Sequence, residues 1–216
     1  MIFDLFRKKK EEKNVLPAPL NFRLGGAAEL DLLPFQMVAE QLHFTLPQGA
    51  QTIEAAGFID LGGGAAICRF YTADDGFIQI TTTGGYEIQN IDDIKLFVFE
   101  QTHNIASQRG VDLWVSDSGT IGRPEFLIDN TVYKRVWDSE VSGKIEAVKL
   151  TETVHTREAG AEAYEVDHLA MLYQRQIPEN DRYEYLLTSL EFTDDDEATA
   201  VVSLGVDLNI SSMSIM

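Results

Sequence analysis

The sequence predicts a mainly β protein of the α+β class, with antiparallel sheets in a sandwich or β-roll-like arrangement and one short helix near the amino terminus. From residue 52 onward, about ten short runs rich in β-branched and aromatic residues follow one another, separated by turn signals. Before residue 52, only one stretch has apolar residues at helical spacing. Closely spaced strands joined by short turns are typical of antiparallel sheets.

Composition bounds the kind of protein. The chain has 216 residues, of which 44% are hydrophobic and 24% charged, so a core can form and wholesale disorder is excluded. Its 17 Lys and Arg against 35 Asp and Glu give a net charge of −18, which opposes general binding to DNA or RNA. No apolar run approaches the roughly 18 residues that a membrane-spanning helix needs.

Cysteine use and the amino terminus favour the cytoplasm. Cys68 is the only cysteine, so the chain can form no internal disulfide and no thiolate cluster for a metal. The basic run 7–10 follows a short apolar start, whereas a secretory signal has its charge first and a longer apolar stretch next. Cys68 lies in a strand-like run and is predicted to be a buried small hydrophobe.

The amino-terminal third is predicted to be irregular except for one helix. Residues 1–20 are expected to be a flexible tail, and residues 21–216 a β-rich domain. Two prolines and two glycines make 14–31 read as a linker or irregular lead-in. A short helix is expected over 33–43, with Asp31 as its cap, a proline in the first turn and apolar residues at helical spacing.

The middle of the chain is predicted to form strands joined by glycine-containing turns. Gly62-Gly63-Gly64 is expected to be a tight turn, and Asp74-Asp75-Gly76 a hairpin turn, because glycine accepts positive φ cheaply. The segment 94–100 fits both a strand and a helix, and the strand is preferred. The strands expected here are 53–61, 65–72, 77–83, 94–100, 111–116, 125–128 and 131–137.

The final third is predicted to be an antiparallel meander. Its expected strands are 147–155, 163–175, 183–192 and 198–208, with turns at 159–160, 178–181 and 194–197. A weak internal echo links 66–80 with 170–186, since both run from an apolar strand through Tyr and an acidic turn to an aromatic and a second apolar strand. A true duplication would support two β lobes that meet near 103–110.

Motifs for chemistry are missing from the sequence. The four histidines form no metal-ligand pattern, and the acidic turn 194–197 lacks the ligand spacing of a calcium loop. The three glycines at 62–64 are followed by a strand rather than by the helix that a phosphate loop needs. No Gly-x-Ser-x-Gly is present. The sequence therefore predicts no catalytic residue, no metal and no cofactor, which lowers the odds of an enzyme without excluding one.

One predicted strand carries a candidate ligand or partner patch. Alternation places Tyr133, Arg135 and Trp137 on one face of the strand, where they could bind an anion or a partner. The alternative is a packing strip between lobes. His155 and His168, on neighbouring predicted strands, could join such a site.

The first residues resemble a short amphipathic membrane-surface segment. Residues 1–13 have a net charge of +2, whereas the rest of the chain has −20, so any membrane contact would be weak. The alternative is a frayed tail that docks on the body or on a neighbour. The residues predicted to contact the membrane are Ile2, Phe3, Leu5, Phe6, Arg7, Lys8, Lys9 and Lys10.

Four stretches, taken together, resemble the YjfK-like family of bacterial proteins, a domain of unknown function. They are residues 69–80, 133–137, 171–175 and 184–187. The resemblance covers nearly the whole chain after residue 20. It implies no reaction and no catalytic residue, but it implies a gene neighbourhood with phage-shock-protein-A-like membrane-remodelling proteins, small membrane proteins and peptide-amine ligases of the ATP-grasp type.

These observations favour a non-enzymatic, acidic accessory or adaptor protein of a cytoplasmic, membrane-associated assembly. The expected partner is a protein, with a phage-shock-protein-A-like membrane protein as the candidate, at the inner face of the membrane. The alternative is an enzyme or a small-ligand-binding protein with a pocket between β lobes. Nucleic-acid mimicry by the acidic surface is a third hypothesis, although solubility explains the charge more simply.

Overall fold

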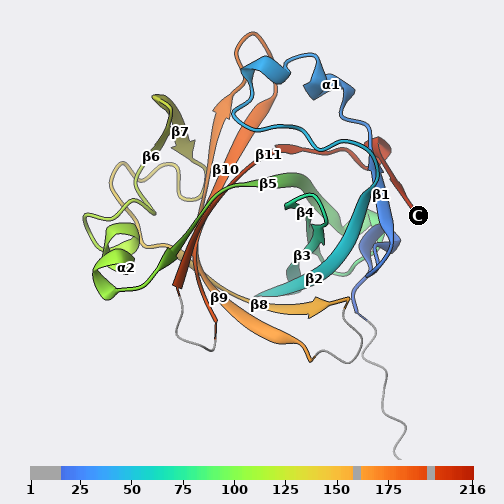
Figure 1. The fold of residues 1–216 in the computed structure, drawn as a ribbon, viewed down its shortest axis with the longest axis horizontal. Helices are drawn as coiled ribbons and strands as arrows, with labels where there is room; N and C mark the ends of the chain where they lie inside the picture. Colours follow the sequence, from blue (N-terminus) through green and yellow to red (C-terminus); the bar gives the residue numbers. More distant parts are fainter. Residues whose placement is uncertain (1–15, 158–161, 194–197) are drawn as a thin grey trace, which may run out of the picture.

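Eight strands close an antiparallel barrel in the computed structural model, which describes residues 16–157, 162–193 and 198–216 (Figure 1). The mainly β prediction is confirmed. The barrel strands are β2 (Gln51–Gly62), β3 (Ala65–Thr72), β4 (Gly76–Thr83), β5 (Ile91–Ile105), β8 (Val148–Thr156), β9 (Tyr164–Gln176), β10 (Tyr183–Phe192) and β11 (Ala198–Asp207).

The barrel consists of two four-stranded meanders. β2 to β5 pair in chain order, as do β8 to β11, and the meanders join where β5 pairs with β11 and β2 with β8. The echoing segments 66–80 and 170–186 form the second and third strands of their meanders, so they occupy equivalent places. Both halves of the chain contribute to one closed sheet, and β5 runs unbroken as far as Ile105.

The predicted sandwich or roll is corrected to a closed barrel. The difference lies in the pairing of β2 with β8, which joins residues about a hundred positions apart in the sequence through only four registered pairs, Ala55–Phe58 with Thr153–Thr156. Strand patterns show which residues face a core. They do not show whether the last strand returns to the first.

Further strands extend the sheet outside the barrel. β1 (Ala27–Leu30) pairs with β2 and with β12 (Met213–Ile215), and β6 (Glu125–Ile128) and β7 (Thr131–Arg135) form a hairpin that joins β9. β1 falls in the segment predicted to be irregular. Its four residues gain strand structure through pairing with the opposite end of the chain, which no local pattern reveals.

The predicted amino-terminal helix is shorter than expected. α1 spans Leu33–Gln36, and Asp31 accepts a hydrogen bond from the amide of Leu33 at 3.1 Å. Val38 leaves the helical region with φ −124°, and a short 3-10 turn, Ala39–Gln41, follows. Three other 3-10 turns are Pro19–Asn21, Ile88–Asn90 and Ile210–Ser212.

A second helix replaces the strand predicted over 111–116. α2 spans Gln108–Val115, and the Ser107 hydroxyl caps it by accepting a hydrogen bond from the amide of Gly110. Val111, Trp114 and Val115 pack against the core at helical spacing. The cap and this spacing outweigh the β propensity of the two valines.

The glycines at two predicted hairpins have different roles. Gly62, Gly63 and Gly64 all have positive φ, as predicted for a tight turn. In the second hairpin, Asp75 takes the positive φ of 53°, while Gly76 begins β4. A Cβ on Gly76 would lie 2.6 Å from the Phe97 carbonyl oxygen, so this glycine permits close approach to β5.

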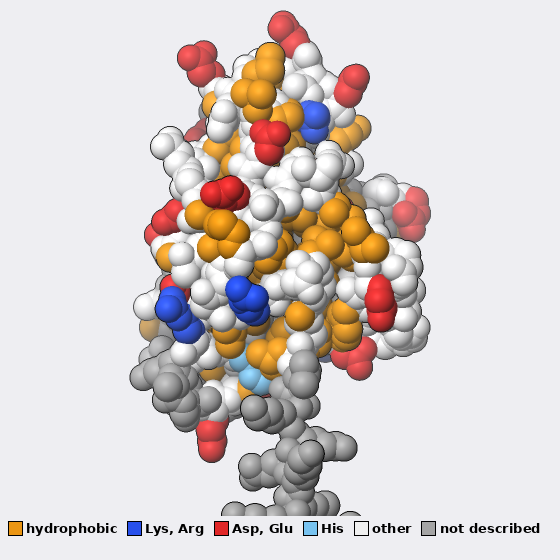
Figure 2. All heavy atoms as spheres, turned by 90° about the vertical axis from the view of Figure 1, so that its right-hand side faces the viewer, with side chains coloured by type: hydrophobic (Ala, Val, Ile, Leu, Met, Phe, Trp, Pro, Cys, Tyr) orange, Lys and Arg blue, Asp and Glu red, His pale blue; other side chains and the backbone are white. Residues whose placement is uncertain are grey.

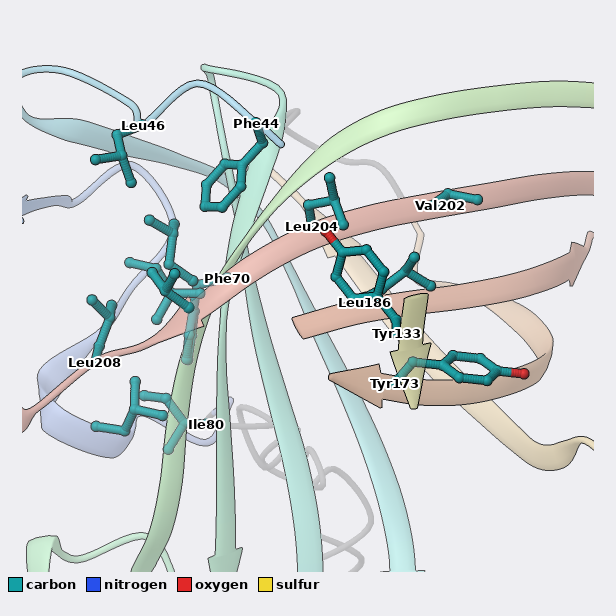
Figure 3. Close-up of a cluster of buried hydrophobic side chains, with 14 of the residues drawn as sticks. Phe44, Leu46, Phe70, Ile80, Tyr133, Tyr173, Leu186, Val202, Leu204 and Leu208 are labelled. Atoms are coloured by element: carbon teal, nitrogen blue, oxygen red, sulfur yellow. The ribbon is translucent and has the colours of Figure 1, made fainter. Parts of the chain in front are cut away.

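The barrel wall separates two hydrophobic layers. On β8, Leu150 and Glu152 are buried while Lys149 and Thr151 are exposed, so the first pair points into the barrel. Phe77 and Phe97 belong to the same inner layer. The outer layer lies between the barrel wall and the covering segments. Figure 3 shows part of it: Phe44, Leu46, Phe70, Ile80, Tyr133, Tyr173, Leu186, Val202, Leu204 and Leu208.

Cys68 lies in this outer layer with no exposed surface, which confirms its prediction as a buried hydrophobe. Burial raises the pKa of its thiol to about 12, so the thiolate does not form near neutral pH.

Candidate functional site

The barrel interior holds a buried charged network. Arg69 on β3, Glu152 on β8 and His168 on β9 are 4%, 0% and 3% exposed. Tyr71 on β3 and Glu191 on β10 complete it. All five side chains point inward, because each occupies the alternate positions that face the barrel interior. Charged residues are rarely buried unless they are paired, so their contacts decide what they can do.

Glu152 is the centre of this interior network. Its carboxylate accepts hydrogen bonds from Arg69 and from the hydroxyl of Tyr71, each at 2.7 Å. Nε2 of His168 lies 3.0 Å from Glu152, and Nδ1 lies 3.4 Å from Glu191. The His168 contacts are close ion pairs that do not meet the geometry of a hydrogen bond. With His168 protonated, two positive charges face two negative ones.

A glycine makes room for this carboxylate. Gly57 on β2 pairs with Arg69 on one side and with Val154 on the other. A Cβ on Gly57 would lie 1.6 Å from Oε1 of Glu152. The side chain of Glu152 therefore crosses over Gly57 to reach Arg69, two strands away from β8.

The pKa shifts follow from this geometry. Burial alone would raise the pKa of Glu152, but the charge of Arg69 and the contacts with His168 and Tyr71 lower it to about 2. Burial would also raise the pKa of Glu191, yet His168 keeps it below its usual value. For His168, burial lowers the pKa, while contacts with the two carboxylates outweigh burial and raise it. The geometry therefore stabilises the charged forms of Glu152, Glu191 and His168, whose charges, with that of Arg69, neutralise one another.

A second ionic cluster lies at the end of the barrel where β5 begins. Nζ of Lys95 lies 2.6 Å from Asp93 and 2.7 Å from Asp207, and 4.2 Å from the centre of the Tyr185 ring. The Tyr185 hydroxyl donates to Asp207 at 2.8 Å. This cluster joins β5, β10 and β11.

Tyr133, from the candidate patch, is fully buried. Its hydroxyl donates to Glu184 at 2.7 Å, and Arg175 donates to the same carboxylate at 2.6 Å. The backbone amide of His43 also donates to Glu184 at 2.7 Å. Tyr133 thus ties β7 to β9, β10 and the loop before β2.

Arg135, 4% exposed, holds a loop together. Its guanidinium donates to four backbone carbonyls, those of Gly122 at 2.6 Å, Gly143 at 2.8 Å and Asp138 at 2.9 Å, and that of Val141. A guanidinium has five donors in a planar fork, which suits the gathering of several carbonyls.

The structure does not bring the three patch residues to the surface together. Tyr133 and Arg135 share a face of β7, as alternation predicts, but that face packs inward. Trp137 lies beyond the end of β7 and is partly buried against both hydrophobic layers. His155 and His168 also stay apart, since His168 points into the barrel and His155 packs against Phe58 on the outside.

A hollow of about 820 Å³ opens where the barrel closes, and we call it the seam hollow. β2 and β8 meet at the lower right of Figure 1 and pair only as far as Phe58 with Thr153, after which the two strands diverge. None of the network's charged residues lines this hollow. Its lining is Phe58, Ile59, Asp60, Leu61, Gly64, Ala65, Ala66, Tyr86, Val148, Lys149, Leu150, Thr151 and Thr153.

The predicted membrane-contact residues fall outside the described residues, as do the turns expected at 159–160 and 194–197. The membrane-contact set comprises Ile2, Phe3, Leu5, Phe6, Arg7, Lys8, Lys9 and Lys10. In the part of the chain that is described, no helix is long and apolar enough to cross a membrane.

The outer surface reflects the charge of the chain. Figure 2 shows the face that carries β1 and the carboxyl terminus, where hydrophobic side chains gather in the middle and acidic ones lie around the rim. Basic side chains are few on this face. Such a surface repels phosphate backbones and attracts basic partners.

The fold and the site define a class: a closed antiparallel barrel with an internally neutralised charged interior and a hollow at its seam. The chain belongs to the family described as protein of unknown function (DUF2491), whose model matches residues 2–214. It is 36% identical to the uncharacterized protein YjfK of Escherichia coli (strain K12) over 214 residues, 96% of this chain and 95% of that protein. This match confirms the family resemblance predicted from the sequence. No solved structure matches significantly.

Proposed function

We propose that this chain is a non-enzymatic accessory or adaptor protein of a cytoplasmic, membrane-associated assembly. One observation carries the proposal: Arg69, Glu152, His168 and Glu191 are paired with one another inside the barrel and line no part of the seam hollow. A catalytic acid or base must reach its substrate directly or through one water molecule. These groups instead hold four strands together.

The acidic surface supports a protein partner. A net charge of −18 steers oppositely charged surfaces toward the chain and suppresses encounters with like-charged ones. The partner that we propose is a phage-shock-protein-A-like membrane protein, the candidate implied by the family resemblance.

The amino-terminal sequence supports weak contact with the inner face of the membrane. Each basic residue near an anionic bilayer contributes about 1 kcal/mol, so the run 7–10 offers only marginal binding once repulsion from the acidic body is included. A weak contact of this kind becomes effective when a partner holds the chain at the same surface.

The test is co-sedimentation with vesicles. The full chain should pellet with phosphatidylcholine–phosphatidylglycerol vesicles in the presence of the partner, and a chain lacking residues 1–13 should pellet less. Vesicles of phosphatidylcholine alone should retain neither. A chain with Lys8, Lys9 and Lys10 each changed to Gln keeps the apolar residues and isolates the charge. Equal pelleting of full and shortened chains, or none with anionic lipid and partner, would remove the membrane part of the proposal.

A second candidate function, small-ligand binding, is favoured by the volume of the seam hollow, which is in the range of ligand pockets. Native mass spectrometry of the chain purified from its own host discriminates between the two functions. A bound small molecule of constant mass, lost when Leu150 is changed to Asp, would favour the ligand-binding function over the adaptor.

A further inference from the structure

We infer that the seam hollow is a docking site for an extended peptide segment of a partner protein, which adds as a strand to the exposed edge of β8. This inference rests on the proposed adaptor function and names the surface that would serve it. The two strands that border the hollow supply the first reason. β8 starts at Val148, but its pairing with β2 begins only at Thr153.

Residues 148–152 of β8 therefore pair with β9 on one side only, among the described residues. An unpartnered strand edge presents a row of backbone donors and acceptors, which is the template used in strand addition. Five residues of strand extend over about 17 Å, enough to align a short peptide.

The edge of β2 on the other side of the hollow is less suited to pair with an added strand. On β2, the carboxylate of Asp60 accepts a hydrogen bond from the amide of Gly62 at 2.8 Å, so this donor is already used. β2 also turns into the glycine loop directly after Gly62. An incoming strand would therefore pair with β8 and contact β2 through side chains.

The side chains of the hollow define what the peptide presents. Ile59 and Leu150 are buried at its base, while Leu61 and Tyr86 remain 44% and 41% exposed at its rim. A strand points alternate side chains to opposite faces, so apolar residues at every second position would cover these groups.

Charge sets the remaining positions of the peptide. Asp60 lies on one edge of the hollow, and Asp167 lies beside Thr151 on the β8 side, joined to it by a hydrogen bond of 2.6 Å. Lys149 is the basic exception, against a net charge of −18 for the chain. The partner segment is therefore extended, apolar at alternate positions and basic between them.

The probe is a short fluorescein-labelled peptide of alternating Val and Lys, added to the full chain and followed by fluorescence anisotropy. A peptide of the same charge in which each Val is replaced by Pro controls for simple charge attraction, because proline cannot pair as an added strand. Leu61→Asp and Tyr86→Asp should each weaken binding about tenfold, which corresponds to roughly 1.4 kcal/mol. Leu113→Asp, at an apolar residue on α2 that is 67% exposed, should leave binding unchanged.

Hydrogen exchange gives an independent measurement. The alternating peptide should slow the exchange of amides in residues 149–151, and the proline peptide should not. No binding, equal binding of both peptides, or equal binding by Leu61→Asp and Leu113→Asp chains would overturn the inference.

Other occupants would give different results. Binding that occurs only after removal of residues 1–13 would show that the chain's own amino terminus takes the site. A dimer that Leu61→Asp dissociates, measured by sedimentation velocity, would show a second copy. Either outcome would show that a partner peptide is not the occupant of the seam hollow, and would overturn the inference. Vesicle co-sedimentation does not depend on the seam hollow, so failure here and failure of the proposed function are distinguishable.

Discussion

At the scale of single residues, the fold depends on positions where a side chain crosses the barrel. Glu152 reaches Arg69 only because β2 carries glycine at the crossing point, Gly57. Removing one partner of a buried ion pair typically costs about 3–5 kcal/mol, because the other charge is left buried without compensation. The network is therefore sensitive to small changes in shape as well as in charge.

Gly57→Ala should lower the free energy of unfolding by about 3–5 kcal/mol, because the new methyl group would overlap the Glu152 carboxylate and displace it from Arg69. Urea denaturation followed by circular dichroism measures this effect. Gly143→Ala is the matched control, since a Cβ there meets no atom within 4 Å. Comparable stability of the two variants would mean that Glu152 can reach Arg69 by another route.

Of the residues in this network, only His168 was named as a candidate from the sequence, and it was paired with His155 rather than with the charged residues that it contacts. The four charged residues lie on four predicted strands separated by up to about 120 residues: Arg69, Glu152, His168 and Glu191. Arg69, Glu152 and His168 each alternate with inward-facing hydrophobic residues, whereas Glu191 follows the polar Ser189. That pattern marks a buried charge only once the inward face of the strand is known. Without an assignment of the inward face, the buried acidic residues of an acidic chain cannot be told from the exposed ones.

At the scale of elements, most strands could be predicted well, because local patterns of apolar residues and turn residues define them. The strands expected at 65–72, 125–128 and 183–192 agree with β3, β6 and β10 at both ends. The errors fall where tertiary contacts decide. β1 needs β12 to exist as a strand, and α2 needs the capping by Ser107.

The long connection 116–147 shows how one side chain can order an element. Apart from the hairpin β6–β7, this segment has little regular structure, and Arg135 binds carbonyls at both of its ends. Arg135 was predicted to be part of a ligand or partner patch because a basic side chain between two aromatic ones is typical of such a patch. Inside a fold, the same guanidinium satisfies backbone acceptors that would otherwise be buried without partners.

Arg135→Lys should loosen this segment. Lysine keeps the charge but cannot gather four carbonyls with three donors on one nitrogen, so we expect a loss of about 2 kcal/mol and faster cleavage within 116–147 by a broad-specificity protease. Mass spectrometry of the fragments locates the cuts. Lys134→Ala, at the exposed neighbour, should behave as the unchanged chain. Equal cleavage of the two variants would show that Arg135 does not order the segment.

At the scale of the whole molecule, closure of the barrel could not be predicted. The strands of both meanders, their echo and the second meander itself are recognisable in the sequence, yet two seams of unequal length decide the architecture. β5 and β11 share ten registered pairs, whereas β2 and β8 share four. The short seam leaves the hollow, so the most interesting surface of the molecule arises from a pairing that no local pattern contains.

The charged interior also makes the stability of the whole barrel depend on pH. The pKa of Glu152 is lower in the folded chain than its ordinary value of 4.5, so its contribution is present above about pH 4.5 and is lost as pH falls toward 2. The pKa of His168 is raised above 6.5, so its contribution is present below pH 6.5 and is lost as pH rises through the folded pKa. Both contributions are complete only between about pH 4.5 and 6.5.

Urea unfolding measured across pH should therefore give a maximum within that window. On the acid side, the part due to Glu152 is on the order of 3 kcal/mol. Glu152→Gln should lower stability throughout and flatten the acid limb, while His168→Gln should flatten the alkaline limb. His103→Gln, at an exposed position on β5, should preserve both limbs. An alkaline limb that persists in His168→Gln would mean that His168 is not the group whose deprotonation weakens the barrel, and that the stabilising pair is Arg69 with Glu152 alone.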